Sequence, residues 1–400
     1  FGPRRLRRRQ LKRAAGQKLL EHAVRAMQSE SEHPLSRAQL ATLCVAAGEA
    51  PPLRADEVTL EQARLSLDHN PLRSLGFLAA LSPQFGNLAA VRTIAAKWSG
   101  ENTKPGWGFA LTGDFAAALS SPEVDAVVLC SPHKAHAAQI AAAAAAGKHV
   151  FCEKPFVMSK AEAERAVAAV RAAGVTLGLG YNRRFHPSWV DLKNRINSGE
   201  LGTILHVECT MSGPNGLTLA KDAWRGSSAQ APCGGLFPMG VHAVDGLIDL
   251  FGDIESVFCH SFRRAVPNEN DDTTSVLFRM KSGMSAYLGT MMATAGTFRF
   301  QVYGSKAMAL LGGSVHVAGQ SSEHRRAGLF GSYVIQPIKG DATALEVPMF
   351  DVNRAELEAF ATAAKGGAPY PVTFAQMING VSATDAIIAS SKSHKLEVVA

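Results

Sequence analysis

Two short apolar runs of this 400-residue chain are each followed by polar residues of types that do chemistry. The run 125–130 is followed by a Ser-Pro-His motif, and the run 149–152 by a Glu-Lys-Pro motif. A lysine ammonium can stabilise negative charge that develops on an oxygen, and a histidine can exchange a proton near neutral pH. The candidate residues are Ser131, Pro132, His133, Glu153, Lys154 and Pro155.

A strand, a helix and a second strand must hold these two motifs. The segment 125–130 is rich in β-branched residues, the Ala-rich segment after it reads as a helix that ends at Gly147, and 149–152 is a second strand. Such units cross over right-handed into a parallel sheet, which binds ligands at the carboxyl ends of its strands. We therefore expect both motifs to lie at one edge of a parallel sheet.

The elements that follow continue this pattern. Ser159 predicts the N-cap of a helix over 160–173, and Gly174 marks where that helix stops. An apolar run over 175–179 predicts another short strand. After it come the sequence GYNRRFHP and a further predicted helix over 189–199.

Beyond Thr203 the chain changes to longer runs of alternating apolar and polar residues, which predict a largely antiparallel sheet with one covered face. One helix, over 241–251, is embedded among these strands, and the last part of the chain is helical. We expect a basic, helical N-terminal extension over 1–70, a first α/β domain over 71–187 and a second domain over 188–400.

The net charge of +7 belongs to the N-terminal arm. Residues 1–20 hold eight Lys or Arg and no acidic residue, so the rest of the chain is close to neutral. A basic arm can bind nucleic acid or a membrane surface, and an Arg-rich, acid-poor start resembles a transit peptide. We adopt the simpler interpretation of a solvated extension or a gene-boundary artefact, because no aromatic residue is interleaved with the arginines.

Composition excludes several classes of protein. No apolar run approaches the roughly 18 residues that a membrane span needs. The six cysteines are scattered without CxxC spacing, which predicts neither a zinc site nor a disulfide framework. The histidines and acids show no metal-ligand spacing either. We therefore expect a cytoplasmic protein that holds no metal and does not bind a membrane.

Four motifs together identify a family. The sequences SPHKAH (131–136), HVFCEKP (149–155), GYNRRFHP (180–187) and GGLFPMGVHAVD (234–245) resemble, in order and spacing, the glucose-fructose oxidoreductase, inositol dehydrogenase and MocA family. This resemblance implies a Rossmann-type domain followed by a domain with a large, open-faced, mainly antiparallel sheet. It also implies hydride transfer between NAD or NADP and a secondary alcohol of a sugar, polyol or cyclic diol. Homo-dimers or homo-tetramers that form through the open face of the sheet are expected.

The resemblance also assigns roles to single residues. Lys154 would meet the nicotinamide ribose and a substrate hydroxyl, and its charge would hold the alkoxide as hydride leaves. His242 would be the general acid/base that takes the hydroxyl proton. Glu153 would orient the cofactor or the lysine, and Pro155 would fix the turn in the cis form. Around the nicotinamide the resemblance places Ser131, Pro132, His133, His136, Glu153, Lys154, Pro155, Asn182, Arg183 or Arg184, Trp224 and Arg225.

Three of these assignments have structural alternatives that the sequence leaves open. Arg184 can instead pair with an acid at the domain interface. His136 can cap the Ala-rich helix, and Trp224 can be a buried aromatic side chain. The choice of cofactor is open as well: Arg92, after the predicted second strand, would suit the 2′-phosphate of NADP, but NAD is equally compatible with the sequence.

The chain departs from the family pattern at two places. Family members open with a strand, a GxGxxG turn and a helix that bind the cofactor pyrophosphate, but residues 1–75 contain only isolated glycines. An altered reading frame upstream of Leu72 would account for this. The second place is Pro238, where the family commonly has an aspartate. Either Lys154 and His242 act alone, or Asp245 or another group substitutes, or the substrate differs.

Two other functions compete with that of an oxidoreductase. A catalytically silent family member would bind a ligand or partner without turnover, which both departures would suit. A nucleic-acid-binding protein would use the basic arm, and its affinity would fall steeply with salt. We expect the oxidoreductase, with a small sugar or polyol as substrate and no nucleic acid as partner.

Overall fold

The computed structural model describes residues 115–122, 124–219, 226–313 and 330–400. The predicted extension over 1–70, the missing glycine turn, Arg92, Trp224 and Arg225 lie outside these residues. The chain divides into two compact units, 1–121 and 122–400. Helix α6 (Phe115–Ser120) belongs to the first unit, and everything below concerns the second.

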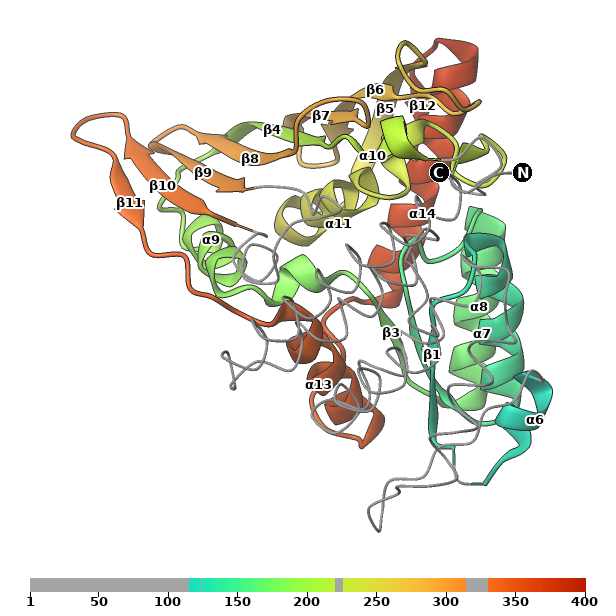
Figure 1. The fold of residues 1–400 in the computed structure, drawn as a ribbon. Helices are drawn as coiled ribbons and strands as arrows, with labels where there is room; N and C mark the ends of the chain where they lie inside the picture. The colour runs from blue at the N-terminus through green and yellow to red at the C-terminus, as the bar shows by residue number, and fades with distance from the viewer. Residues whose placement is uncertain (1–114, 123, 220–225, 314–329) are drawn as a thin grey trace, which may run out of the picture. The chain divides into compact units, whose positions relative to one another are not determined.

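A small parallel sheet forms the first region of this unit. Strands β1 (Ala126–Leu129), β2 (His149–Cys152) and β3 (Leu177–Leu179) lie in that order, and both neighbouring pairs are parallel. The predicted strand–helix–strand unit is confirmed, with helix α7 (His136–Ala145) between β1 and β2. Helix α8 (Lys160–Ala173) packs against α7 beside the sheet (Figure 1).

The ends of α8 are set by the residues that the sequence indicates. The hydroxyl of Ser159 accepts a hydrogen bond from the backbone N–H of Glu162, which satisfies one of the free donors of the first turn. Gly174 ends the helix with φ of 66°, a left-handed conformation that glycine adopts without a steric penalty. Both predicted boundaries are confirmed.

A nine-stranded sheet forms the second region. Its order is β11-β10-β9-β8-β4-β7-β6-β5-β12, and every neighbouring pair is antiparallel except β4 and β7, which are parallel. The prediction of a mainly antiparallel sheet is confirmed. The strands are β4 (Ile204–Ser212), β5 (Ile254–Phe262), β6 (Thr273–Met280), β7 (Ser285–Met291), β8 (Thr297–Gly304), β9 (Ala307–Gly313), β10 (Ser332–Pro337), β11 (Thr343–Leu345) and β12 (Glu397–Val398).

Helices cover one face of the large sheet. Helices α9 (Pro187–Asn197) and α11 (Gly240–Phe251) lie beneath it in Figure 1, and α11 is the embedded helix that the sequence predicts. Trp189 of α9 is buried under β8, with its ring 5.0 Å from that of Phe300. A Cβ at Gly246 of α11 would lie 2.7 Å from the Trp189 ring, so only glycine lets the two helices approach this closely.

The last two long helices connect the two regions. Helix α13 (Val352–Ala364) packs on the parallel sheet through Phe360, whose ring lies edge to face with that of Phe151 at 5.6 Å. Helix α14 (Phe374–Ser393) contacts both regions. Its Asp385 accepts a hydrogen bond from the backbone N–H of Lys160, and its Asn379 accepts one from Ile254.

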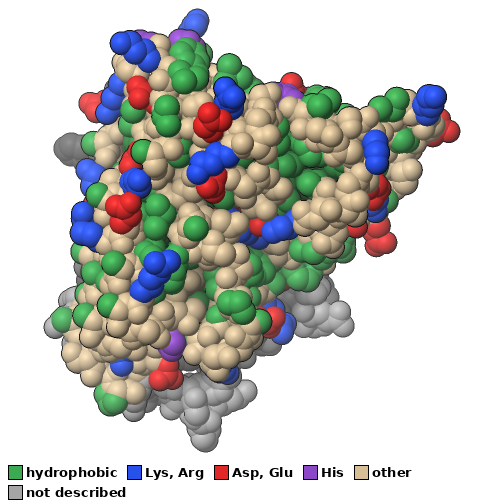
Figure 2. Space-filling model, turned by 180° about the vertical axis from the view of Figure 1, so that it is seen from behind, with side chains coloured by type: hydrophobic (Ala, Val, Ile, Leu, Met, Phe, Trp, Pro, Cys, Tyr) green, Lys and Arg blue, Asp and Glu red, His purple; other side chains and the backbone are tan. Residues whose placement is uncertain are grey.

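The other face of the large sheet is open. Leu277 of β6 lies between the buried Val276 and Phe278 and is 54% exposed, which matches the open face that the family resemblance implies. Figure 2 shows basic and acidic side chains interspersed on the face seen from behind, rather than gathered by sign. Among the described helices, none is both long and apolar enough to span a membrane.

Candidate functional site

The two motifs at the carboxyl edge of the parallel sheet are held together by His136. The ring of His136 is fully buried, and its Nδ1 lies 2.9 Å from the carbonyl oxygen of Pro155 and 3.2 Å from that of Phe156. Its Nε2 lies 3.0 Å from the carbonyl oxygen of Ser131. Each ring nitrogen thus lies within hydrogen-bonding distance of main-chain oxygens, Nδ1 of the loop after β2 and Nε2 of the loop after β1. This geometry ties the loops after β1 and β2 to each other.

The Glu-Lys-Pro turn directs Lys154 toward the start of α11. Its Nζ donates a hydrogen bond to the carbonyl oxygen of Pro238, with a distance of 3.0 Å. Its backbone N–H donates to Glu153 Oε2, with a distance of 3.2 Å. The peptide bond between Lys154 and Pro155 is cis, as the resemblance implies. The turn therefore joins the parallel sheet to the helix that carries the predicted acid/base.

His242 lies in the first turn of α11, in contact with one aromatic ring. The Tyr181 ring meets the His242 ring edge to face at 6.1 Å. His133 stacks on Phe237 at 5.8 Å, in the segment directly before α11. Tyr181 also precedes the short helix η2 (Asn182–Phe185), so the GYNRRFHP motif reaches α11 as well. Residues of all four predicted motifs meet around the N-terminus of this helix.

The carboxylate of Glu153 lies close to the backbone of β3. A Cβ at Gly180 would lie 3.3 Å from the Glu153 carboxyl group, so a side chain there would displace it. Helix α13 carries a second carboxyl group, that of Glu356, which is 4% exposed. Burial raises the pKa of Glu356 well above its ordinary value, and the charge of Glu153 raises it further. Asn182 donates to Asn353 Oδ1 of the same helix.

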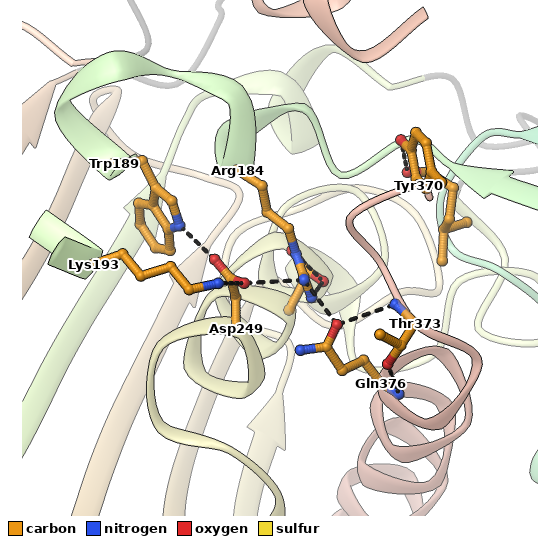
Figure 3. Close-up of polar contacts among 9 residues, drawn as sticks. Arg184, Trp189, Lys193, Asp249, Tyr370, Thr373 and Gln376 are labelled. Atoms are coloured by element: carbon orange, nitrogen blue, oxygen red, sulfur yellow. Dashed lines mark hydrogen bonds and ion pairs between the residues drawn. The ribbon is translucent and has the colours of Figure 1, made fainter. Parts of the chain in front are cut away.

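A buried ionic network centres on Arg184 (Figure 3). Its guanidinium donates to both carboxylate oxygens of Asp245, and Nη2 lies 2.6 Å from Oδ1. Its Nη1 donates to Asp249 and to Gln376, each with a distance of 3.0 Å. The side chains of Arg184, Asp245 and Asp249 are only 4–5% exposed. This network fixes η2 to α11 and α14.

Asp249 completes the network with two further donors. Its Oδ2 accepts a hydrogen bond from Trp189 Nε1 at 2.9 Å, and its Oδ1 accepts one from Lys193 Nζ at 2.6 Å. Both donors belong to α9. The network therefore positions a third helix against α11.

Of the two roles that the sequence leaves open for Arg184, the structure shows the pairing with an acid. Burial raises the pKa of Asp245 to about 6, against the opposing effect of the Arg184 charge and hydrogen bonds. The carboxylate of Asp245 is bound by Arg184, and its substitution for the aspartate that Pro238 replaces stays a prediction. The main-chain oxygen of Pro238 is instead a partner of Lys154.

Arg183 differs sharply from its neighbour. Its Cζ lies 5.3 Å from the centroid of the Phe298 ring on β8. Its Nε and Nη1 are buried, and neither has a hydrogen-bond partner among the described residues. Burial lowers the pKa of Arg183 to about 10. The sequence gives no signal for this difference, because the two arginines are adjacent and of one type.

The sequence does not indicate two further residues of the site, Glu356 and Asp249. Glu356 lies in a polar helical segment whose buried face depends on contact with η2, and Asp249 acquires its role only from three helices that meet at one point. The described residues contain no cluster of His, Cys, Asp and Glu that could hold a metal ion.

Sequence comparison matches the chain to two family models. One is described as the NAD-binding Rossmann fold of an oxidoreductase family and matches residues 80–181. The other is the GFO/IDH/MocA C-terminal domain and matches residues 189–310. Between them, these two models cover more than half of the chain.

Characterised and uncharacterised relatives are similar over part of their length. The chain is 33% identical to the uncharacterised oxidoreductase YrbE of Bacillus subtilis over 50% of this chain and 58% of that protein. It is 32% identical to a myo-inositol 2-dehydrogenase of Thermotoga maritima over 47% of this chain and 56% of that protein. The chain thus spans little more than half the length of these curated relatives.

Solved structures show the same fold. A proposed NADPH-dependent oxidoreductase from Desulfitobacterium hafniense is 26% identical, with a TM-score of 0.66, and the match covers 72% of this chain and 83% of that one. Levoglucosan dehydrogenase in complex with NADH is 20% identical, with a TM-score of 0.61 and coverage of 72% and 83%. At this identity, the second likeness concerns the fold alone.

Proposed function

Because the chain belongs to the Gfo/Idh/MocA family of oxidoreductases, we propose that it is an NAD(P)-dependent dehydrogenase. Its reaction is reversible hydride transfer at a secondary alcohol of a sugar, polyol or cyclic diol. The relatives named as myo-inositol and levoglucosan dehydrogenases support this class of substrate.

The observation that carries the proposal is the hydrogen bond from Lys154 Nζ to the carbonyl oxygen of Pro238. This bond brings the lysine of the sheet edge to the segment that leads into α11, four residues before His242. A cation and an imidazole in this arrangement serve one reaction. The lysine lowers the pKa of a substrate hydroxyl and stabilises the alkoxide, while the histidine accepts the proton.

Pro238 changes how this pair is supported. A proline side chain can neither accept a proton nor bind a hydroxyl, so the acid that the family commonly has here is replaced by a main-chain acceptor. A carbonyl oxygen is uncharged, and it orients Lys154 without neutralising the ammonium. The transfer of the proton then depends on His242, and the stabilisation of the developing negative charge depends on Lys154.

The residues at the sheet edge fit the nicotinamide half of the cofactor. The buried side-chain oxygens Asn182 Oδ1 and Gln230 Oε1 have no hydrogen-bond partner among the described residues, and both belong to segments around this edge. The loops 131–133 and 153–155 would hold the nicotinamide and its ribose, as would Asn182. The nicotinamide supplies the hydride acceptor when bound. His136 contributes by holding the two loops in register, since its ring nitrogens are already used.

In the first experiment the purified chain is titrated with NADH and with NADPH. Binding is measured as energy transfer from the protein fluorescence to the nicotinamide. Micromolar binding of one of them is expected, and the tighter of the two names the cofactor. Absence of binding at millimolar cofactor would contradict the proposal. Binding without turnover of any sugar or polyol would instead indicate the catalytically silent alternative.

Substitutions then test the two roles. We expect His242→Ala to lower kcat by about 100-fold or more, the usual contribution of a general base. Lys154→Met should lower kcat by a similar factor, because the developing alkoxide loses its cation. Lys281→Met removes an exposed lysine that pairs with Asp253 and serves as the matched control, with activity unchanged. If the Lys154 and His242 variants were as active as the unmodified chain and the Lys281 control, both roles would be excluded.

The open sheet face supports a proposal about assembly. We propose that copies of the chain associate through this face as a homo-dimer or homo-tetramer. Light scattering would measure the mass in solution, and Leu277→Glu would shift it to that of a single chain. A single-chain mass for the unmodified protein would contradict this part of the proposal.

A further inference from the structure

We propose that the guanidinium of Arg183 binds a carboxylate of the substrate, so that the substrate is a polyhydroxylated acid and not a neutral polyol. That this ligand is the substrate rests on the proposed function. The anion site itself rests on the surroundings of Arg183 alone.

Two buried nitrogens of the Arg183 guanidinium lack acceptors within the described part of the chain. Nε and Nη1 of Arg183 are buried and have no hydrogen-bond partner among the described residues. A charged donor that is left without an acceptor in a protein interior is strongly destabilising, and such groups are ordinarily paired. An acceptor supplied by a ligand would remove this penalty.

Arg183 keeps its charge, and no acid among the described residues forms an ion pair with it. Although burial lowers the pKa of Arg183, its value of about 10 leaves the side chain cationic at neutral pH. Asp245 is the acid whose charge acts on it, but that carboxylate already makes three hydrogen bonds to Arg184. A negative charge brought by a ligand therefore meets a cation with which no acid among the described residues forms an ion pair.

Arg183 lies close to the helix that carries His242. Arg183 projects from η2 over the Phe298 ring of β8, on the covered face of the large sheet. Tyr181, two residues before it, contacts the His242 ring. The charge of Asp245, on the same helix as His242, also acts on Arg183. An anion on this guanidinium would therefore lie beside α11 and would belong to the same ligand as the reacting alcohol.

The chemistry of the site favours a carboxylate over other acceptors. A planar guanidinium matches the two oxygens of a carboxylate with two parallel hydrogen bonds, and the aromatic ring beneath it adds a cation–π contact. The neighbouring guanidinium of Arg184 is neutralised by Asp245 and Asp249, so of these two adjacent guanidiniums that of Arg183 is the one left for a ligand. One charge suits a carboxylate better than a phosphate dianion.

The test compares a matched pair of probes on the ligand-free chain. Isothermal titration calorimetry would measure the binding of sodium D-gluconate and of D-glucitol, which have the same chain length and differ in the carboxylate, with ionic strength held constant by sodium chloride. We expect gluconate to bind at least about tenfold more tightly, given the strength of hydrogen bonds between charged groups.

The variant Arg183→Gln should weaken gluconate binding by about tenfold or more and leave glucitol binding unchanged. The control is Arg299→Gln, which removes an equal charge at a half-exposed residue paired with Glu208 and should change neither. Equal gluconate binding by the unmodified chain and Arg183→Gln would overturn the inference, as would the absence of gluconate binding. If Arg183→Gln does not fold, Arg183→Lys keeps the charge without the planar fork and should give a smaller loss.

This test separates the inference from the proposed function. Because it is done without cofactor, gluconate binding that depends on Arg183 stands even if neither NADH nor NADPH binds, and in that case only the dehydrogenase proposal fails. Conversely, a chain that binds NADH but does not distinguish gluconate from glucitol retains the dehydrogenase proposal and loses the acid substrate.

Discussion

The side of η2 that faces α11 and the side that faces the large sheet surround an arginine in opposite ways. On the α11 side, Arg184 has four hydrogen-bond acceptors from two acids and one amide, supplied by two helices. On the sheet side, Arg183 has an aromatic ring and no acceptor for two of its nitrogens among the described residues. A fully paired cation connects helices, whereas an unpaired one is available to a ligand.

The largest expected effect is from breaking the paired side. Arg184→Met would leave Asp245 and Asp249 buried without their main cation, and the free energy of unfolding should fall by about 3–5 kcal/mol. Urea denaturation followed by circular dichroism would measure it. A loss below about 1 kcal/mol would mean that the two sides of η2 do not differ in the way described.

Glu356 extends the comparison to a buried acid. Its carboxyl group is 4% exposed, and Oε2 has no partner among the described residues. Because its pKa in the folded chain lies well above the ordinary 4.5, the folded chain keeps a proton that the unfolded chain loses. Its contribution to stability is therefore complete below about pH 4.5 and falls by about 1.4 kcal/mol per pH unit until the folded-state pKa is reached.

The variant Glu356→Gln should lack this dependence. Unfolding free energies of the two chains would be compared from pH 5 to pH 8, where the difference between them isolates this one group. We expect Glu356→Gln to become progressively the more stable chain as pH rises. Curves that stay parallel would show that Glu356 does not hold its proton.

Replacement of Arg183 should change the free energy of unfolding in the opposite direction to replacement of Arg184. Without ligand, Arg183→Met replaces an uncompensated cation by an apolar side chain of similar length, and the unfolding free energy should rise by about 1 kcal/mol. Thermal and urea denaturation of the ligand-free chain would measure it. A loss comparable to that of Arg184→Met would show that Arg183 is also a structural cation.

The smallest effect is expected at the edge of the network. The Lys193 side chain is 40% exposed, and Asp249 keeps Arg184 and Trp189 as donors without it. Lys193→Met should therefore lower the unfolding free energy by less than about 1 kcal/mol, with the difference shrinking in high salt. A larger loss would place Lys193 inside the essential network.

Much of the fold could be predicted because its signals are local. Ser159 and Gly174 mark the ends of α8, and the run 149–152 followed by Glu-Lys-Pro marks a strand and its turn. The embedded helix was predicted to begin at residue 241 and is observed from Gly240. Each of these depends on residues within one turn or one strand of each other.

The remaining features depend on contacts that no local pattern contains. Arg183 and Arg184 are adjacent in sequence, and only the positions of α11 and β8 give them different partners. The parallel pairing of β4 with β7 is equally invisible, because the alternation of residues along a strand is the same for either direction. The roles predicted for Lys154 and His242 stay predictions, although the structure brings their motifs together.

The position of β4 in the middle of the large sheet has a consequence for synthesis of the chain. Its two partners, β7 and β8, begin at Ser285 and Thr297, whereas β4 ends at Ser212, so about 70 residues must leave the ribosome before either edge of β4 can be covered. Unpaired strand edges in incomplete chains promote aggregation. A fragment that stops before Thr297 would keep one edge of β4 bare and should require a chaperone to stay in solution, even though β7 would already cover the other edge.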